Sequence, residues 1–171
     1  MEFTFETHYD RKALTAMAKG LRKTVRKKHS RRSHIFGWIV FFLALLLSWP
    51  SADGVEKKDV VTWIVMVILL LVLLLEDRLN GWIAKLRMLP GTDHSVATFS
   101  EDGYRSETDM GNTEWKYENI AAMAEMPDYF VFLFSKNHAQ VYDKRSITGG
   151  TAEEFRTFIQ EKTGKTVKPV K

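Results

Sequence analysis

The stretch that decides the fold is residues 35–75, IFGWIVFFLALLLSWPSADGVEKKDVVTWIVMVILLLVLLL, which holds two apolar runs, Ile35–Trp49 and Val60–Leu75. A helix rises about 1.5 Å per residue, so roughly 17 to 25 apolar residues cross a bilayer core about 30 Å thick. The first run reaches that length at Ala52, and the second reaches it by extending to Leu79. Neither run carries a charge or a polar stripe, which disfavours a pair of buried helices in a soluble protein. We therefore expect a transmembrane hairpin with spans over about residues 35–52 and 60–79.

Charge predicts the orientation of this hairpin. Between Arg11 and Arg32 the chain carries ten basic residues and no acidic one, whereas the loop between the runs is mixed in sign. Because cytoplasmic flanks are rich in Lys and Arg, we expect a multi-pass protein of the cell membrane with both termini in the cytoplasm. We expect the basic side chains nearest the membrane to contact anionic headgroups of the bilayer: Arg22, Lys23, Arg26, Lys27, Arg31 and Arg32. The same basic segment is also compatible with a regulated lipid sensor or with a docking face for an acidic partner.

Composition divides the chain into three parts. Residues 1–34 hold ten basic and three acidic residues, residues 35–90 hold five of each, and residues 91–171 hold ten basic and thirteen acidic. The parts are interpreted as an N-terminal strand with a basic amphipathic helix, the hairpin with an amphipathic exit helix, and a cytoplasmic domain of sheet and helix. Cysteine is absent, which excludes disulfides, thiol catalysis and cysteine metal sites.

The segments that flank the hairpin show their own periodicities. Residues 2–6 alternate between apolar and polar, which predicts a short strand, and Asp10 is placed to cap a following helix. That helix carries apolar residues at helical spacing and is expected to run on toward the first span. After the second span, apolar residues repeat at i, i+3, i+4 and i+7 from Leu79 to Leu86, so that span is expected to continue as an amphipathic helix as far as Pro90.

The C-terminal part predicts a small antiparallel sheet closed by one helix, an α+β architecture. The expected strands are 96–99, 104–108, 113–117, 120–126, 129–134 and 139–142. Residues 129–134 are apolar on both faces, which favours the central position of the sheet. Thr151 and Glu154 have the spacing of a capping box, and Phe155, Phe158 and Ile159 form one face of the helix that follows. We also expect Phe3 and Phe5 to complete this sheet, because a lone strand would leave its backbone groups unpaired.

Several of these residues carry a family resemblance. Glu101-Asp102-Gly103-Tyr104, Trp115 followed by Ile120, and Asp128-Tyr129-Phe130-Val131-Phe132 stand in the same order before the closing helix. In this order the chain resembles the YcxB-like family of small bacterial membrane proteins. The resemblance implies a C-terminal domain similar to bacterial pleckstrin-homology-like folds, which bind proteins more than phosphoinositides, and it implies no catalytic residues. The family places a Pro-Lys pair after the last strand, where this chain has Asp143-Lys144, so a different turn is expected there.

The residue types and spacings of the sequence do not favour an enzyme. The five histidines lack helical spacing to another ligand, so no metal site and no cofactor is expected. Gly149-Gly150 precedes a helix start and could approach an anion, although a plain loop is preferred. Glu76 and Asp77 are interpreted as a solvated helix exit, with contact to a partner or ion pairs to the arginines of the basic segment as the alternatives. Nucleic acid is not expected as a partner, because no aromatic residues are interleaved with the basic ones.

Three functions remain open from the sequence. The first is a membrane-anchored cytoplasmic protein-interaction module, with Tyr129, Val131 and Leu133 as the candidate interaction face and a protein partner or a homo-oligomer as its ligand. The second is an accessory or regulatory subunit of a membrane transporter or membrane enzyme, whose spans form the interface through small residues such as Gly37, Ala44 and Ser48. The third, and least favoured, is an enzyme that acts at the membrane surface.

Overall fold

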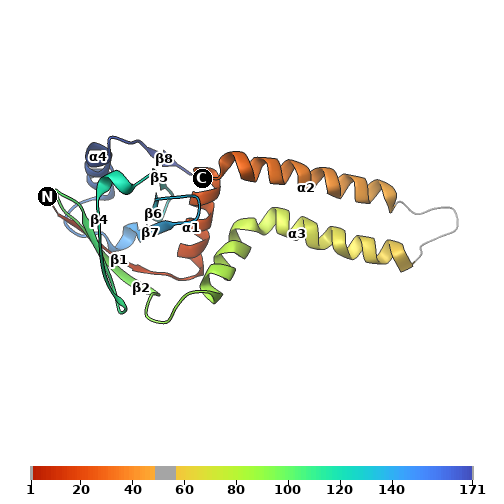
Figure 1. Cartoon of the computed structure of the whole chain (residues 1–171), viewed down its shortest axis with the longest axis horizontal. Coiled ribbons are helices and arrows are strands. Elements are labelled where there is room, and N and C mark those ends of the chain that lie inside the picture. The colour runs from red at the N-terminus through yellow and green to blue at the C-terminus, as the bar shows by residue number, and fades with distance from the viewer. Residues whose placement is uncertain (1, 49–56, 171) are drawn as a thin grey trace.

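Two sheets and a closing helix form one end of the molecule, the head, and a long helical hairpin projects from it (Figure 1). The computed structural model describes residues 2–48 and 57–170. The helices are α1 (Arg11–Lys23), α2 (Lys27–Leu47), α3 (Lys57–Leu86) and α4 (Ala152–Thr163), with 3₁₀ turns η1 (Tyr117–Asn119) and η2 (Lys144–Ser146). The strands are β1 (Phe3–His8), β2 (His94–Phe99), β3 (Tyr104–Thr108), β4 (Gly111–Trp115), β5 (Ala122–Glu125), β6 (Tyr129–Leu133), β7 (Ala139–Asp143) and β8 (Val167–Pro169). The expected α+β class is confirmed.

The first sheet has the order β1-β2-β3-β4 and is antiparallel throughout. Phe3 lies opposite Phe99 and Phe5 lies opposite Ala97, so the N-terminal strand joins the C-terminal sheet as predicted. Both phenylalanines are fully buried, because alternation directs every second side chain of β1 into the core. Hydrogen bonds in both directions between the backbones of Thr4 and Thr148 tie the free side of β1 to the connection that follows β7.

The second sheet has the order β7-β6-β5-β8. All five residues of β6 are buried, and β6 lies between β5 and β7, which confirms its expected central position. β8 pairs parallel to β5, with Met123 opposite Val167. This strand was not expected, because three residues that include Pro169 give no periodic signal. The turn after β7 is the 3₁₀ turn η2, begun by the Asp143 carboxylate, which accepts a hydrogen bond from the Arg145 N–H at 2.9 Å.

Aromatic rings fill the space between the two sheets and α4. The Phe155 ring lies 4.6 Å from that of Phe5, 4.9 Å from that of Phe99 and 5.2 Å from that of Phe130, measured between centroids. These edge-on contacts place α4 as the lid of the core. The predicted capping box is present, since the Thr151 hydroxyl accepts from the Glu154 N–H and the Glu154 carboxylate accepts from the Thr151 N–H.

A second apolar cluster lies on the opposite face of the second sheet, where α1 covers β6 and β7. Ala13, Ala16 and Leu21 of α1 belong to the same buried cluster as Val131 and Leu133. A Cβ atom built on Gly20 would lie 2.8 Å from Val131 Cγ1, so glycine permits this close approach. The helix and the strand are therefore in direct contact.

This packing corrects one expectation from the sequence. Tyr129, Val131 and Leu133 are 7 %, 0 % and 0 % exposed, so the candidate interaction face is part of the core. The sequence showed that β6 is apolar on both faces but did not show that α1 covers the second of them.

The basic segment is also not one continuous helix. α1 ends at Lys23, Thr24 takes a non-helical conformation, and α2 begins at Lys27. The Thr24 hydroxyl donates to the carbonyl oxygen of Gly20 at 2.6 Å, and the Arg26 N–H donates to that of Leu21 at 2.9 Å. These bonds close the end of α1 and let the chain change direction into the hairpin.

α2 and α3 are long and apolar enough to cross a membrane, by length and composition. Their large apolar side chains are mostly exposed, and α3 bends at Leu75, where the backbone leaves helical geometry. The bend turns residues 76–86, here called the exit helix, from the hairpin toward α1 (Figure 1). The expected continuation of the second span is therefore confirmed to Leu86, and the expected end of the first span at residues 49–52 lies outside the described residues.

Candidate functional site

A cluster of four charged or titratable side chains joins three helices at the base of the hairpin. Arg22 of α1 donates from Nε to Asp77 Oδ1 at 2.6 Å and from Nη2 to Asp77 Oδ2, which makes a bidentate pair. The second carboxylate, Glu76, lies 3.6 Å from Arg22 Nε and 2.6 Å from Nε2 of His34 on α2. We call these four residues the charged junction. The hydrogen bond to Asp77 raises the pKa of the Arg22 guanidinium.

The charged junction corrects the interpretation of Glu76 and Asp77 as a solvated helix exit. The Asp77 side chain is 15 % exposed and that of Arg22 is 21 % exposed, so the pair is largely shielded from water. The alternative from the sequence, a pairing with the basic segment, is confirmed for Arg22. Both carboxylates follow the bend at Leu75 directly, so the bend brings them toward α1 and α2.

The six basic residues expected to contact the membrane fall into two groups. Arg22 is engaged in the charged junction, and Arg26 donates to the carbonyl oxygen of Lys136 at 2.5 Å and to Asn137 Oδ1 at 2.7 Å. These two hold the helices to each other and to the loop after β6. The remaining four are exposed: Lys23, Lys27, Arg31 and Arg32.

A cavity of about 520 Å³ opens beside the charged junction, between α1, the start of α2 and the exit helix. Its polar lining includes the side chains of Arg26, His29, Ser30, Ser33 and Arg87. Basic pockets between membrane helices on the cytoplasmic side are suited to lipid headgroups. Glu76 also lines this cavity, so its lining is mixed in sign.

The exit helix and α1 cross in close contact. A Cβ atom built on Gly81 would lie 2.6 Å from Thr15 Oγ1 and 2.8 Å from the Thr15 backbone nitrogen. Lys85, one turn later, donates from Nζ to the carbonyl oxygen of Tyr9 at 3.1 Å. The head is thus attached to the hairpin by helix packing as well as by the chain itself.

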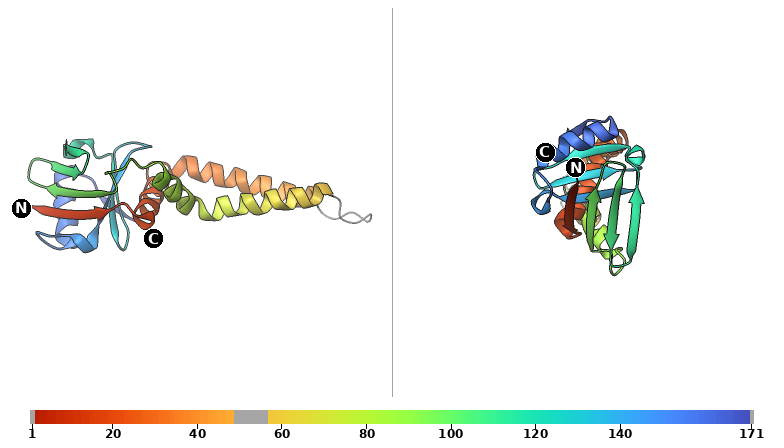
Figure 2. Two further views of the ribbon diagram at one scale, coloured as in Figure 1. Left: turned by 90° about the horizontal axis from the view of Figure 1, so that it is seen from below. Right: turned by 90° about the vertical axis from the view of Figure 1, so that its left-hand side faces the viewer.

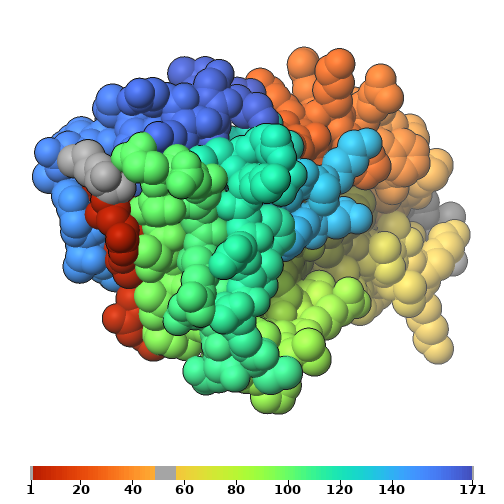
Figure 3. Space-filling view, turned by 60° about the vertical axis from the view of Figure 1, so that its left-hand side comes forward, coloured from red at the N-terminus to blue at the C-terminus, as the bar shows by residue number. Residues whose placement is uncertain are grey.

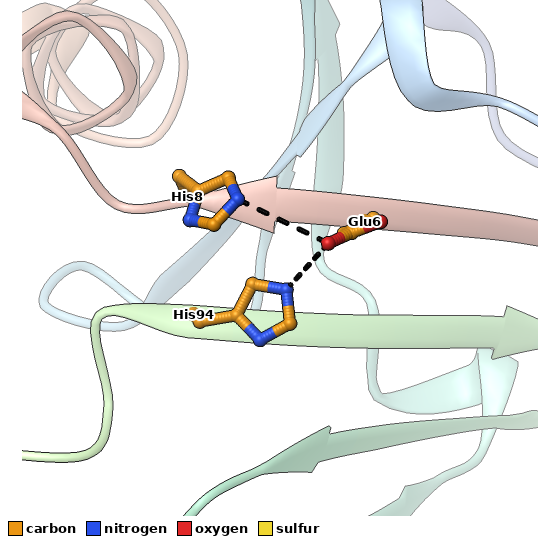
Figure 4. Close-up of side chains that lie close together, drawn as sticks. All are labelled: Glu6, His8 and His94. Atoms are coloured by element: carbon orange, nitrogen blue, oxygen red, sulfur yellow. Dashed lines mark hydrogen bonds and ion pairs between the residues drawn. The ribbon is translucent and has the colours of Figure 1, made fainter.

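A second set of side chains converges on the outer face of the first sheet, near the hairpin (Figure 4). Glu6 and His8 extend from β1 and His94 extends from β2, and one potential ligand atom from each lies within 4.8 Å of the other two. Glu6 Oε1 is 2.9 Å from His94 Nε2 and 3.9 Å from His8 Nε2. We call these three residues the His–Glu cluster. Two imidazoles and a carboxylate are a donor set that suits a transition-metal ion.

Helical spacing in the sequence does not reveal the His–Glu cluster, because its residues lie on strands. Glu6 and His8 are two residues apart, the spacing that puts side chains on one face of a strand. The missing part is the register, which places His8 opposite His94, 86 positions later. The expected strand ended at Glu6, and extending it to His8 would have put the first two residues on one face.

A partly buried network of opposite charges links the second sheet to α4. The Glu125 carboxylate accepts from Arg156 Nε at 2.6 Å, from Arg156 Nη2 at 2.8 Å and from Lys144 Nζ at 2.7 Å. Its side chain is 14 % exposed. The hydrogen bond from Arg156 is the largest of the contributions that lower the pKa of Glu125. These contacts hold β5, η2 and α4 together, so the network has a structural explanation.

Gly149 and Gly150 are explained by crowding rather than by an anion. A Cβ atom on Gly149 would lie 2.0 Å from the carbonyl oxygen of Glu2, and one on Gly150 would lie 2.6 Å from Phe3 Cε1. Gly149 also has a φ of 85°, which side chains disfavour. The pair lets the loop before α4 pass over β1, and the preferred interpretation as a loop is consistent with this geometry.

Comparison with known proteins adds a match to a family model over part of the head. The family model described as YcxB-like protein matches residues 99–159, from the last residue of β2 into α4. No curated protein and no solved structure matches the chain. The matched stretch contains Glu101–Tyr104, Trp115 and Asp128–Phe132, the motifs on which the resemblance rests. The resemblance of this chain to the YcxB-like family is therefore confirmed over residues 99–159.

Proposed function

We propose that the chain is a membrane-anchored protein whose hairpin spans the bilayer and whose head is a cytoplasmic protein-interaction module. The observation that carries this proposal is the exposure of the hairpin. Phe36, Leu46 and Leu47 are 68 %, 71 % and 86 % exposed, and most large apolar side chains of α2 and α3 are exposed with them. A core helix of a soluble protein would bury such residues, whereas lipid covers them in a membrane.

The charges support an orientation with the head in the cytoplasm. The exposed basic residues of α1 and α2 lie at the head end of the hairpin, where they would meet anionic headgroups. The charged junction also lies at the head end of the hairpin, and the bend at Leu75 separates it from the apolar part of α3. β1 precedes the helices of the hairpin and β2 follows them, and the two strands pair in one sheet. Both ends of the hairpin therefore lie on the same side of the membrane.

The form of the head supports an interaction module of the pleckstrin-homology-like kind. Two four-stranded sheets enclose an aromatic core that one C-terminal helix closes. β4 is the outer strand of the first sheet, pairs only with β3 among the described strands, and has four exposed residues out of five. Figure 3 shows β3 and β4 on the surface of the head. An outer strand of this kind can accept an extended peptide by strand addition, so we assign the partner surface to β4 in place of the buried face of β6.

The anchor is tested by single cysteines, because the chain has none of its own. Lys57→Cys, at the start of α3, should react with a membrane-impermeant maleimide in intact cells. Lys136→Cys, in the exposed loop after β6, should react only after the cells are permeabilised. Both residues are exposed, so access to the reagent depends on the side of the membrane. Reaction of both variants in intact cells, or of neither, would contradict the proposed topology.

The interaction surface is tested by photo-cross-linking in the native membrane. A photoreactive residue at Glu114 of β4 should give a discrete adduct with a protein partner, because the side chain is exposed on the outer strand. The matched control is Glu153, an exposed acidic position on α4 away from this edge. Equal adducts at both positions, or none at Glu114, would count against strand addition at β4.

The accessory-subunit function remains the second candidate, but two of its expected contact residues serve the hairpin itself. A Cβ atom on Gly37 would lie 2.7 Å from Leu73 Cδ2, and the Ser48 hydroxyl lies 3.8 Å from Met66 Sδ. These residues therefore pack α2 against α3. The exposed apolar faces of α2 and α3 would then contact the larger membrane protein. Purification of the chain from the native membrane in a fixed ratio with one such protein would favour this function over the interaction module.

A further inference from the structure

We propose that Glu6, His8 and His94 form a binding site for a divalent transition-metal ion of the Zn²⁺ class. The site is distinct from the charged junction and from the β4 edge. The proposed site does not depend on the proposed function, because its ligands are side chains held by the first sheet.

The distances in the His–Glu cluster fit the ligand separations of such an ion. Metal–ligand bonds of about 2.0–2.2 Å in a tetrahedron place neighbouring ligand atoms about 3.3–3.5 Å apart. The separations from Glu6 Oε1 are 2.9 Å to His94 Nε2 and 3.9 Å to His8 Nε2, which bracket that value. The three ligand atoms lie within 4.8 Å of one another. Small side-chain rotations therefore bring all three to bonding distance without any movement of the backbone.

The strands hold the ligands in place before any ion binds. His8 and His94 are direct partners in the β1–β2 register, and Glu6 is two residues away on the same face. The pairing continues beyond the strands, since the Tyr9 N–H donates to the carbonyl oxygen of Asp93 at 2.8 Å. The Glu6 N–H donates to Ser146 Oγ at 3.1 Å, which fixes the backbone of the third ligand. A rigid sheet reduces the cost of ordering the ligands.

The donor set selects the class of ion. Imidazole nitrogen suits Zn²⁺, Cu²⁺ and Ni²⁺, whereas Ca²⁺ and Mg²⁺ take oxygen ligands almost exclusively. Asp143 interacts electrostatically with His8, but its Oδ1 already accepts a hydrogen bond from Arg145 Nε at 2.9 Å. The protein thus supplies three ligands, and at least one position on the ion stays open to water or to a group from another molecule.

The place of the cluster in the fold gives the ion a structural consequence. His8 is the last residue of β1, which leads into α1, and His94 is the first residue of β2, which follows α3. A bound ion would join the two strands at the end where both connect to the helices. It would therefore oppose fraying of this end of the sheet, and metal should protect the backbone amides there from exchange.

The test is Zn²⁺ titration of the full-length chain in detergent micelles, purified without a polyhistidine tag. We expect one saturable equivalent by calorimetry, and tetrahedral absorption bands when Co²⁺ replaces Zn²⁺. His8→Gln, His94→Gln and Glu6→Gln should each weaken binding by about tenfold or more, since even second-shell changes cost about 10- to 100-fold. Binding should also weaken as the pH falls, because protons compete for the imidazoles. Mg²⁺ should not compete.

The matched control is His29→Gln, which removes an exposed imidazole from α2 and leaves the cluster intact. Thermal unfolding without metal checks that each variant folds, which is expected because Glu6 and His8 are exposed and His94 is only partly buried. Equal binding by wild type and His94→Gln would overturn the proposal, as would equal losses in His94→Gln and His29→Gln. Unchanged binding by Glu6→Gln would overturn the three-ligand set.

Discussion

Replacing Gly81 with valine should loosen the attachment of the head to the hairpin. A Cβ atom at this position would lie 2.6, 2.8 and 2.9 Å from the hydroxyl oxygen, nitrogen and Cα of Thr15. Two of these atoms are backbone, so the exit helix and α1 must separate by roughly 0.5–1 Å, which forfeits a quarter to a half of each contact across the interface.

The size of the effect follows from two opposing contributions. Overpacking of a close contact costs about 1–3 kcal/mol. Valine in place of glycine recovers about 0.4 kcal/mol of helix propensity. The free energy of opening α1 away from the exit helix should therefore fall by about 0.6 to 2.6 kcal/mol, which corresponds to a loss of amide protection of about 3- to 80-fold.

Hydrogen exchange of the full-length chain in micelles measures this loss. Peptides from α1 and from residues 76–86 should exchange faster in Gly81→Val, whereas peptides from α4 should be unchanged, because α4 packs on the other side of the core. The matched control is Asn80→Val, which puts the same residue on an exposed position of the same helix. Equal protection of α1 in wild type and Gly81→Val, or equal losses in the two variants, would refute the argument from close packing.

Two further predictions concern the charged groups. A double-mutant cycle of Arg22→Met and Asp77→Leu, measured by the same hydrogen-exchange experiment, should give a coupling energy of about 1.5–3 kcal/mol, because a shielded bidentate pair of charged groups is stronger than a surface pair. A coupling energy near zero would show that the pair does not hold α1 to the exit helix. The pKa of Glu125 is lowered in the folded state, so its contribution to stability is present above the unfolded pKa of about 4.3 and is lost as the pH falls through the folded value. The Tm of wild type should therefore fall more steeply than that of Glu125→Gln as the pH decreases below about 5. Parallel Tm profiles of the two proteins would contradict a stabilising role of ionised Glu125.

The parts of the fold that could be predicted from the sequence are those set by local pattern. Uninterrupted apolar runs identified the hairpin helices, and the Thr151–Glu154 spacing identified the start of α4. The pairing of β1 with the C-terminal sheet was also predicted, from the need of a strand for partners. In the first two cases neighbouring residues alone carry the physical cause, and in the third the cause is the general need of a strand for a partner.

The parts that could not be predicted depend on packing between distant segments. An apolar Val131 is compatible with burial under a helix or against a partner, so the sequence could not show that α1 packs on it. Asp77 is a polar residue after an apolar helix, and only the bend at Leu75 brings it to Arg22. His94 becomes a neighbour of His8 only through the register of two strands that the whole hairpin separates. Long-range register leaves no periodic signal in one sequence.

The bend at Leu75, described above as a change in helix direction, has a mechanical consequence. The exit helix lies against α1, and α1 in turn lies against the second sheet, so the attachment has several points of contact and no free swivel (Figure 2). A hairpin held in a bilayer would then set the tilt and the azimuth of the head. The outer strand β4 would stand at a constant height above the lipid surface, and any force that tilts the hairpin would rotate that strand by the same angle.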